Sequence, residues 1–303
     1  MRNFTFKGLL LTAVFMLLGC LSIQAANDDL ITKQITINLD KAGTLPNKIA
    51  SSEMYKITNL KIIGEINGTD WNMIREMAGR DNRGYGTEGK LSVLDLSEAK
   101  IVKGGDSYYP GDNCYTSNDE IGEKAFTDCS RLTSLTLPVG ITSIGYDAFA
   151  YCSGLTSLNL PAGITSIDKY AFSGCSRLTS LTLPAGITSI GEFAFSYCSG
   201  LTSIYVYAEK VPRIGRYAFE GCASRKCTLY VPKGTYDNYR LSEFGYFENI
   251  VEFDATGIDK TTTSTDVEEV SRYSVNGQRL AVPVKGLNIV KYSDGTARKV
   301  VVK

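Results

Sequence analysis

The chain has 303 residues, a length that suits one elongated domain or two compact ones. Its 32 basic and 32 acidic residues balance, so the composition predicts no surface for nucleic acid, whose binding proteins carry an excess of positive charge. The sequence contains no histidine, which excludes serine and cysteine nucleophiles activated by an imidazole and every zinc site with a histidine ligand.

The N-terminus has the pattern of an export signal. A basic start precedes an apolar run at residues 8–19, which is too short to span a membrane comfortably, and small residues follow. This pattern predicts a secretory signal peptide at residues 1–25, with cleavage near Ala25 or Ala26. The letters LLGC also resemble a lipoprotein signal, in which Cys20 would be acylated and begin the mature chain. Cleavage without a lipid is favoured because apolar residues follow Cys20, and both routes predict a protein exported to the cell surface, the outer membrane or the medium.

Residues 27–102 are predicted to form an N-terminal cap and a first, atypical rung of the repeats that follow. The segments QITINLD and ITNLKIIGEI have the composition of strands. The segment TDWNMIREMAG predicts a short helix that is capped by Thr69 or Asp70 and ended by Gly79. The segment LSVLDLSEAKIV has a leucine-rich strand pattern but no counterpart 23 residues further along, so we expect it to form the first rung.

One glycine-rich segment partly matches a phosphate-binding loop. Residues 84–89 are GYGTEG and Lys90 follows, but Leu91 stands where the motif requires serine or threonine. The segment also leads into a predicted strand, whereas a phosphate loop follows a strand and opens a helix. The sequence therefore predicts no nucleotide or other cofactor.

An insertion at residues 103–120 separates the first rung from the regular repeats. It carries four carboxylates that could ligate calcium, at Asp106, Asp112, Asp119 and Glu120. Their spacing matches no calcium-binding loop, so a polar surface loop is the favoured interpretation and no metal site is predicted.

The centre of the chain is a repeat whose copies begin 23, 23, 23 and 24 residues apart, at Ile121, Ile144, Ile167, Ile190 and Ile214. A period of this length that contains L-x-x-L-x-L predicts a leucine-rich repeat solenoid, an α/β repeat fold with one parallel sheet on its concave side. We assign residues 121–253 to the repeats and their C-terminal cap, in which Tyr239, Phe244 and Phe247 cover the last rung.

The side chains that flank the inward leucines of each predicted strand face solvent and form the concave face. They are the candidate binding residues Ser134, Thr136, Ser157, Asn159, Ser180, Thr182, Ser203, Tyr205 and Tyr207. Serine and threonine are ordinary residues on the solvent side of a strand, which is one interpretation of this surface. The other is contact with a partner, above all at Tyr205 and Tyr207, because tyrosine is enriched in the centres of interfaces.

A cysteine recurs once in each copy, at Cys129, Cys152, Cys175, Cys198 and Cys222. Zinc needs ligands that converge on one point, whereas stacked repeats would place these thiols about 4.8 Å apart along a line. Parallel stacking disfavours disulfides between neighbours, and the chain has no histidine to activate a thiol. We therefore predict a structural ladder of buried, reduced and metal-free thiols. A local disulfide stays open for Cys114, Cys222 and Cys227, as an oxidising compartment would permit.

The repeat unit IGxxAFxxCxxLTSLTLPxGITS resembles the BspA-like leucine-rich repeat family, also called the Treponema pallidum-type repeat. The resemblance covers residues 121 to about 250. Members of this family are surface or secreted bacterial proteins, and some bind host matrix proteins or other bacteria. The resemblance therefore implies a surface protein that binds a partner, which no spacing in the sequence shows by itself.

The composition changes after the repeats. Residues 254–271 are polar and rich in threonine, which is typical of a linker. Residues 272–303 are predicted to form a small β tail, with hairpin turns at Asn276-Gly277 and Asp294-Gly295. This tail resembles, in a shorter form, the C-terminal sorting domains of Bacteroidetes type IX secretion. The alternative is a small β-module without any role in export.

Together these features predict a non-enzymatic surface or secreted protein that mediates protein–protein contact or cell adhesion. We expect no catalytic residue, cofactor or metal, and membrane contact only through a lipid on Cys20. The expected partner is a protein or glycan on a host or bacterial surface. Two alternatives stay open: a surface enzyme or glycan-binding protein that acts through residues 103–120, or a purely structural component of the envelope.

Overall fold

The computed structural model describes residues 30–109, 111, 113–255, 269–274, 279–280, 286–292 and 297–302. The predicted signal peptide with Cys20, Asp112 of the insertion and most of the predicted linker lie outside these residues. None of the helices in the described ranges combines the length and the apolar character that a bilayer crossing requires.

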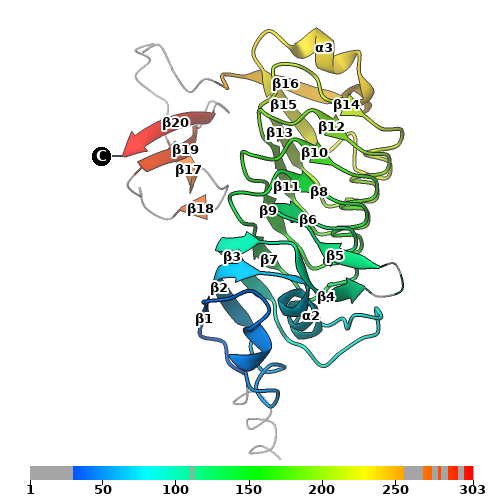
Figure 1. Ribbon diagram of the computed structural model, residues 1–303. Helices are drawn as coiled ribbons and strands as arrows, with labels where there is room; N and C mark the ends of the chain where they lie inside the picture. Colours follow the sequence, from blue (N-terminus) through cyan, green and yellow to red (C-terminus); the bar gives the residue numbers. More distant parts are fainter. Residues whose placement is uncertain are drawn as a thin grey trace, which may run out of the picture.

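The largest element is a sheet of nine strands, each parallel to its neighbours (Figure 1). In spatial order the strands are β1 (Ile35–Leu39), β2 (Asn59–Ile66), β3 (Val93–Ile101), β7 (Ser134–Thr136), β9 (Ser157–Asn159), β11 (Ser180–Leu183), β13 (Ser203–Val206), β15 (Thr228–Pro232) and β16 (Asn249–Phe253). Leu135 pairs with Leu158 and Leu158 with Leu181, so each repeat lies directly on the one before. The predicted leucine-rich repeat solenoid is thereby confirmed.

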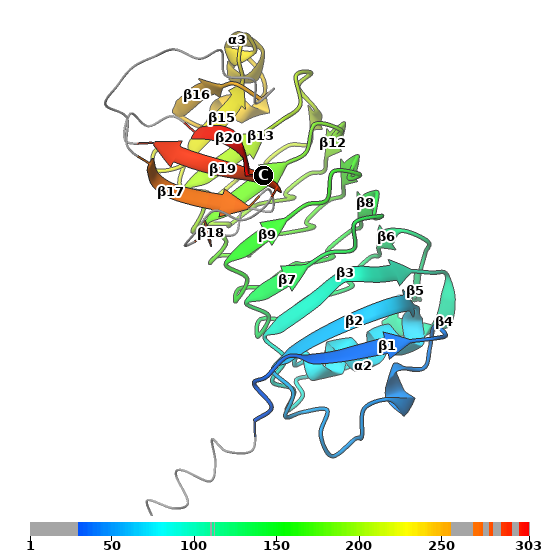
Figure 2. The same cartoon turned by 90° about the vertical axis from the view of Figure 1, so that its left-hand side faces the viewer.

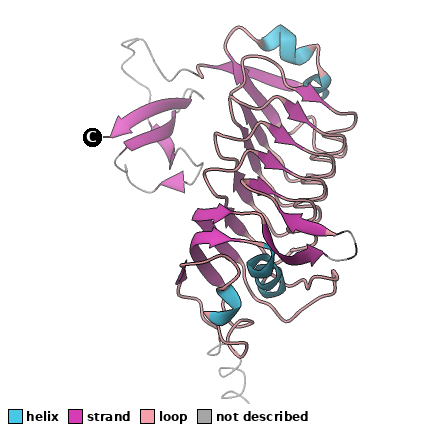
Figure 3. Cartoon of the chain, viewed as in Figure 1, coloured by secondary structure: helices cyan, strands magenta, loops and turns pink. Residues whose placement is uncertain are grey.

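A second, narrower parallel sheet accompanies the first, and the sequence did not predict it. Its strands have two residues each and are β6 (Glu120–Ile121), β8 (Ser143–Ile144), β10 (Ser166–Ile167), β12 (Ser189–Ile190) and β14 (Arg213–Ile214). From this sheet each repeat returns to the main sheet through an outer segment of turns, and the described helices lie at the two ends of the solenoid (Figure 3). A repeat therefore consists of two short strands and one outer segment.

A stack of phenylalanine rings forms the centre of the repeat core. Phe126, Phe149, Phe172, Phe195 and Phe219 are buried, and neighbouring ring centroids lie 5.3, 5.0, 5.1 and 5.5 Å apart. Stacking adds to the hydrophobic free energy gained by removing rings of this size from water. Because the period is 23 residues, or 24 in the last step, the same ring contact recurs between all successive repeats.

The outer segments contain residues in the left-handed backbone region. Tyr151 and Tyr197 have φ angles of 58° and 57°, and the equivalent residues of the following repeats, Gly174 and Gly221, have φ angles of 75° and 73°. Each tyrosine ring covers the glycine that follows it, since a Cβ added to Gly174 or Gly221 would lie 2.7 Å from a ring carbon. Tyr151 and Tyr197 adopt this backbone region at the equivalent positions, so the close approach of the tyrosine ring, rather than the φ angle alone, requires glycine at these two positions.

The N-terminal region extends the main sheet instead of only covering its end. β1 pairs with β2 and β2 with β3, so the segment predicted as the first rung is the third strand. The helix α2 (Gly68–Met77) and the short 3-10 helix η1 (Leu45–Asn47) complete this region. Neither β1 nor β2 belongs to the 23-residue repeat, which is why periodicity did not assign them to the sheet.

The N-terminus of α2 is capped by Asn67 and not by the expected Thr69 or Asp70. The Asn67 side chain accepts a hydrogen bond from the Thr69 amide at 3.1 Å, and the Asp70 carboxylate accepts one from the Asn67 amide at 2.9 Å. This arrangement is a capping box. The same buried carboxylate accepts the amides of Gly43 and Leu45 at 2.6 and 2.8 Å, so Asp70 also holds the loop before η1.

The insertion forms an antiparallel hairpin, β4 (Gly104–Tyr109) and β5 (Cys114–Thr116), where the sequence predicted a loop. Its inner side is apolar because Tyr108 and Cys114 are buried. The Tyr108 ring lies 6.3 Å from that of Trp71, and its hydroxyl donates to the Glu123 carbonyl at 2.8 Å. The hairpin therefore joins α2 to the first regular repeat.

The C-terminal cap consists of the helix α3 (Tyr236–Arg240) and the 3-10 helix η3 (Glu243–Tyr246). Tyr239, Phe244 and Phe247 are buried, and the rings of Phe244 and Phe247 lie 5.3 and 5.1 Å from that of Phe219. The predicted covering of the last rung is confirmed for Phe244 and Phe247, whereas Tyr239 packs against Phe244 and donates to the Ala208 carbonyl.

A separate antiparallel sheet follows the repeats, in the order β18-β17-β19-β20, and we call it the C-terminal sheet. Its strands are β17 (Glu269–Ser274), β18 (Arg279–Leu280), β19 (Gly286–Tyr292) and β20 (Ala297–Val302). The predicted turns at 276–277 and 294–295 lie outside the described residues, but the strands on either side of each turn pair antiparallel. The role of this sheet as a sorting signal stays a prediction.

Candidate functional site

The concave face is formed by the outward side chains of β7, β9, β11 and β13. They form two rows across the strands, Thr136, Asn159, Thr182 and Tyr205 in one and Ser134, Ser157, Ser180 and Ser203 in the other. Thr136 and Ser157 are exposed, and the Ser203 hydroxyl donates to the Ser180 hydroxyl at 3.2 Å. The structure thus brings the predicted residues of these strands together as one hydroxyl- and amide-rich surface.

The concave face carries an aromatic patch near its C-terminal end, which we define as Tyr205, Tyr207, Tyr230 and Phe253. Tyr205 stacks on Tyr230 with ring centroids 4.4 Å apart, and Phe253 meets Tyr207 edge-on at 5.1 Å. Sequence reasoning found Tyr205 and Tyr207 but missed the other two. Tyr230 could have been found, because TLYV of the fifth copy aligns with SIYV of the fourth. Phe253 gave no signal, since it follows the repeats.

The C-terminal sheet lies against this patch, and Figures 1 and 2 both place it beside the concave side of the main sheet. The Lys299 ammonium lies 5.1 Å from the centroid of the Tyr207 ring and donates to the Ala255 carbonyl at 3.3 Å. Burial raises the pKa of Tyr207. The pKa of Tyr205 is raised by burial first and then by neighbouring hydroxyls, including that of Tyr273 in β17.

The thiol column lies in the core, and its members share one kind of partner. The thiols of Cys152, Cys175, Cys198 and Cys222 donate to the carbonyl of the phenylalanine in the preceding repeat, at 3.0, 3.2, 3.1 and 3.1 Å. Burial raises the pKa of Cys129 to about 11, and a hydrogen bond with Cys198 together with burial raises the pKa of Cys175 well above the ordinary value. Protonated, buried thiols are poor nucleophiles, which argues against a catalytic role for this column. Its hydrogen bonds instead join each repeat to the preceding one.

Every cysteine in the described part of the chain is buried, and none of them forms a disulfide. This finding corrects the disulfide that the sequence left open for Cys114, Cys222 and Cys227. The Cys222 thiol is directed at the Phe195 carbonyl, and Cys114 lies in the hairpin close to the buried Tyr108. These thiols are therefore part of the packing of the hairpin and the last repeat.

The carboxylates of the insertion are distributed over different contacts. Asp106 accepts a hydrogen bond from the Thr69 hydroxyl at 2.8 Å, Asp119 lies in a turn with φ 56°, and Glu120 begins β6. Within the described ranges, no three cysteine, aspartate or glutamate side chains are grouped to hold a metal ion. Residues 84–89 are an irregular segment after α2, in which Gly86 forms a bridge with Arg80, and they open no helix, so they lack the helix N-terminus that binds phosphate.

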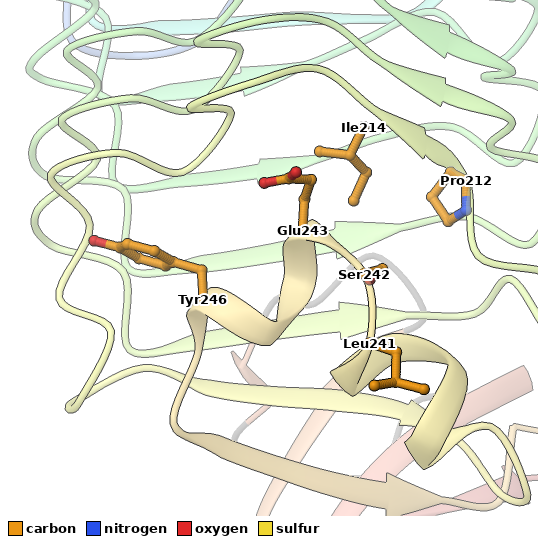
Figure 4. A pocket seen from close by; sticks show the side chains of 6 residues that line it. All are labelled: Pro212, Ile214, Leu241, Ser242, Glu243 and Tyr246. Carbon is orange, nitrogen blue, oxygen red and sulfur yellow. The ribbon is translucent and has the colours of Figure 1, made fainter.

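Two recesses lie away from the concave face. One of about 600 Å³ separates β14 from the C-terminal cap and is lined by Pro212, Ile214, Leu241, Ser242, Glu243 and Tyr246 (Figure 4). Glu243 is the only charged residue among those that line it. The other, of about 680 Å³, is a groove over the narrow sheet, and its Lys169 is paired with Glu192 at 3.0 Å.

Residues 114–237 match the BspA type leucine rich repeat region, in six copies. The repeats in residues 114–237 are therefore similar to the BspA type leucine rich repeat. No curated protein matches the chain. The BspA-type unit explains the constant spacing of the inward phenylalanine, cysteine and leucine positions described above.

The chain is also similar to solved structures of leucine-rich repeat proteins. The T. pallidum protein TpLRR is 29% identical, with a TM-score of 0.37 over 46% of this chain and 64% of its own. A leucine-rich repeat protein from Bacteroides ovatus is 16% identical, with a TM-score of 0.37 over 66% of this chain and 50% of its own. A leucine rich cell surface protein from Faecalibacterium prausnitzii is 20% identical, with a TM-score of 0.33 over 89% and 56%. This chain thus spans less than two thirds of each of these proteins.

Proposed function

We propose that this chain is an exported, non-enzymatic leucine-rich repeat protein that binds a protein partner at a cell surface through its concave face. The observation that carries this proposal is the row of Thr136, Asn159 and Thr182, paired in register on a rigid parallel sheet. Short polar side chains held at fixed spacing offer hydrogen bonds to a partner at little cost in side-chain entropy. The aromatic patch at one end adds the residue types that dominate binding energy in interfaces.

Two features of the chain support binding rather than catalysis. The thiols, which are its conspicuous candidate nucleophiles, are buried and donate hydrogen bonds within the core. In the described part of the chain, the carboxylates of the insertion contact separate elements and join no group of three potential metal ligands. The hairpin therefore does not support the grouped carboxylates that an enzyme or a calcium-dependent glycan-binding protein would use.

Export to the cell surface or the medium is supported by the sequence of residues 1–25, which has the order of basic, apolar and small residues found in signal peptides. We propose a protein partner over a glycan, because the uncovered part of the concave face is polar but carries no aromatic side chain on which a sugar ring could stack. A purely structural envelope component is the outcome to be expected if no ligand binds.

The experiment is a binding screen of the chain from residue 27 onward against matrix proteins, mucin and bacterial glycans, followed by variants of the concave face. Asn159→Arg with Thr182→Arg places two long cations in the centre of the row. Thr165→Arg, at an exposed position just before β10 of the narrow sheet, is the matched control. We expect the double variant to lose at least about tenfold in affinity, equal to roughly 1.4 kcal/mol, and the control to lose none. Equal losses in both variants would place the contact elsewhere, and no binding at all would favour the structural alternative.

A further inference from the structure

The C-terminal sheet occupies the part of the concave face that is best suited to hold a partner. The aromatic patch combines three tyrosines with Phe253 on the adjoining strands β13, β15 and β16 and on the residue after β13. Aromatic clusters of this kind are rarely left exposed to solvent and are usually covered by another element or a partner. Here the covering element belongs to the same chain (Figure 2).

Lys299 of β20 makes the most specific contact of this cover. Its ammonium faces the Tyr207 ring and also donates to the Ala255 carbonyl, just beyond β16. A half-buried lysine gives up hydration, and the ring quadrupole and the carbonyl oxygen replace it. The contact is directional, because it needs a cation at this position and not merely a long side chain.

The cover is partial. Tyr273 of β17 reaches the neighbourhood of Tyr205, whereas Thr136 and Ser157 in the earlier repeats stay exposed. The C-terminal sheet is joined to β16 by the intervening residues of the chain, so its effective concentration at the patch is on the order of millimolar. At such a concentration, a few weak contacts are enough to keep the patch covered, and a partner with more contacts is able to displace them.

We propose that the C-terminal sheet is an intramolecular cover of the aromatic patch, held in place by Lys299, which a partner must displace before it contacts Tyr205 and Tyr207. The consequence for binding rests on the proposed function. The cover itself is a property of the chain alone and is tested without any partner.

The test measures nitration of Tyr207 in the chain from residue 27 onward, by mass spectrometry, relative to Tyr85, which is 70% exposed. Lys299→Met keeps the length of the side chain and removes the charge, and Lys299→Arg keeps a cation. Lys291→Met, at an exposed position of β19, is the matched control. Loss of a cation–π contact predicts a rise of about fivefold in the nitration rate of Tyr207 in Lys299→Met. We expect a rate close to that of the unmodified chain in the other two variants.

A second measurement needs no substitution and excludes an artefact of misfolding. In the unmodified chain, acetylation of lysines by a small ester is followed by mass spectrometry, and Lys299 is expected to react at least about fivefold more slowly than Lys291. Equal rates for these two lysines, or equal nitration of Tyr207 in the unmodified chain and in Lys299→Met, would overturn the proposal.

Failure of the cover and failure of the proposed function give different results. If the cover is absent, a partner of the concave face binds the unmodified chain and Lys299→Met equally, and Asn159→Arg with Thr182→Arg still weakens it. If the cover exists and the concave face binds nothing, nitration responds to Lys299→Met while the binding screen stays empty. If both hold, Lys299→Met increases the affinity for the partner by about the same factor as the nitration rate.

Discussion

The tyrosine ring that covers a glycine of the next repeat gives a sharp test of how the outer segments are held together. Replacing Gly174 by alanine has two costs. A residue with a Cβ at φ 75° is disfavoured by about 1 kcal/mol, and the new Cβ would lie 2.7 Å from Cδ1 of Tyr151, so the ring must move. Displacing this ring, which is 59% exposed, costs about 1 kcal/mol more. We therefore expect Gly174→Ala to lower the free energy of unfolding by about 2 kcal/mol.

A double-mutant cycle separates the two costs. Tyr151 is 59% exposed, so Tyr151→Ala alone should lower the free energy of unfolding by only about 0.5 to 1 kcal/mol. When both substitutions are present, the backbone cost remains but the collision is gone, so the losses should fall short of additivity by about 1 kcal/mol. Urea unfolding at 25 °C measures each corner of the cycle. Additive losses would refute the role of the ring.

Two further sites serve as internal controls for this prediction. Tyr197 and Gly221 repeat the same geometry, with a ring contact at 2.7 Å and φ 73°, and should give the same coupling. Gly186 lies in an exposed turn, where a Cβ would meet nothing closer than the Ala162 carbonyl at 3.6 Å, so Gly186→Ala should change stability by less than about 0.5 kcal/mol.

The remaining predictions concern the core and the N-terminal region. Burial raises the pKa of Cys129 to about 11, so its thiol stabilises the fold fully below pH 9 and this contribution, about 3 kcal/mol, is lost as the pH rises toward 11. Cys129→Ala should therefore reduce the fall of the urea midpoint at alkaline pH. In the unmodified chain, iodoacetamide should label Cys129 only after unfolding. Rapid labelling of the native chain would contradict the buried ladder of thiols. Asp70→Ala leaves the amides of Gly43, Leu45 and Asn67 without their acceptor and should cost about 2 to 4 kcal/mol in urea unfolding. Asp70→Asn keeps one acceptor oxygen and should lower the free energy of unfolding by less than Asp70→Ala does. Equal losses in the two variants would contradict the conclusion that the carboxylate bridges these amides.

The sequence predicted the repeat part of the fold well because the signal there is repeated. A phenylalanine, a cysteine and three leucine positions recur at a constant spacing, and only stacking of identical units buries all of them. The same logic located the outward rows of the concave face, since side chains alternate along a strand. The C-terminal cap followed from three large aromatic residues that had no other surface to cover.

Features outside the repeat were harder to predict. The narrow sheet has strands of two residues, such as Ser166–Ile167, which are too short to show any alternation of side chains. The pairing of β1 with β2 and β3 is a long-range contact between segments of unrelated sequence. The hairpin of the insertion is stabilised by the contact of Tyr108 with Trp71, which no local pattern reveals.

The candidate site shows the same division. Tyr205 stood out because it takes the place of a threonine or asparagine in the earlier repeats, and Tyr207 because it takes the place of their proline. Phe253 completes the aromatic patch from a strand beyond the repeats, and Lys299 reaches it from the C-terminal sheet. Both contacts depend on how separate parts of the chain pack together, so the spacing of residues along the sequence cannot predict them.

The central claim is that the concave face binds a partner, and site-specific photo-cross-linking tests it most directly. A photoreactive phenylalanine analogue is placed at Thr182, in the middle of the polar row, or at Tyr197, which is 60% exposed on an outer segment. With a protein ligand obtained from the screen, we predict a covalent adduct from position 182 and none from position 197. Cross-linking from position 197 without any from position 182 would contradict the account.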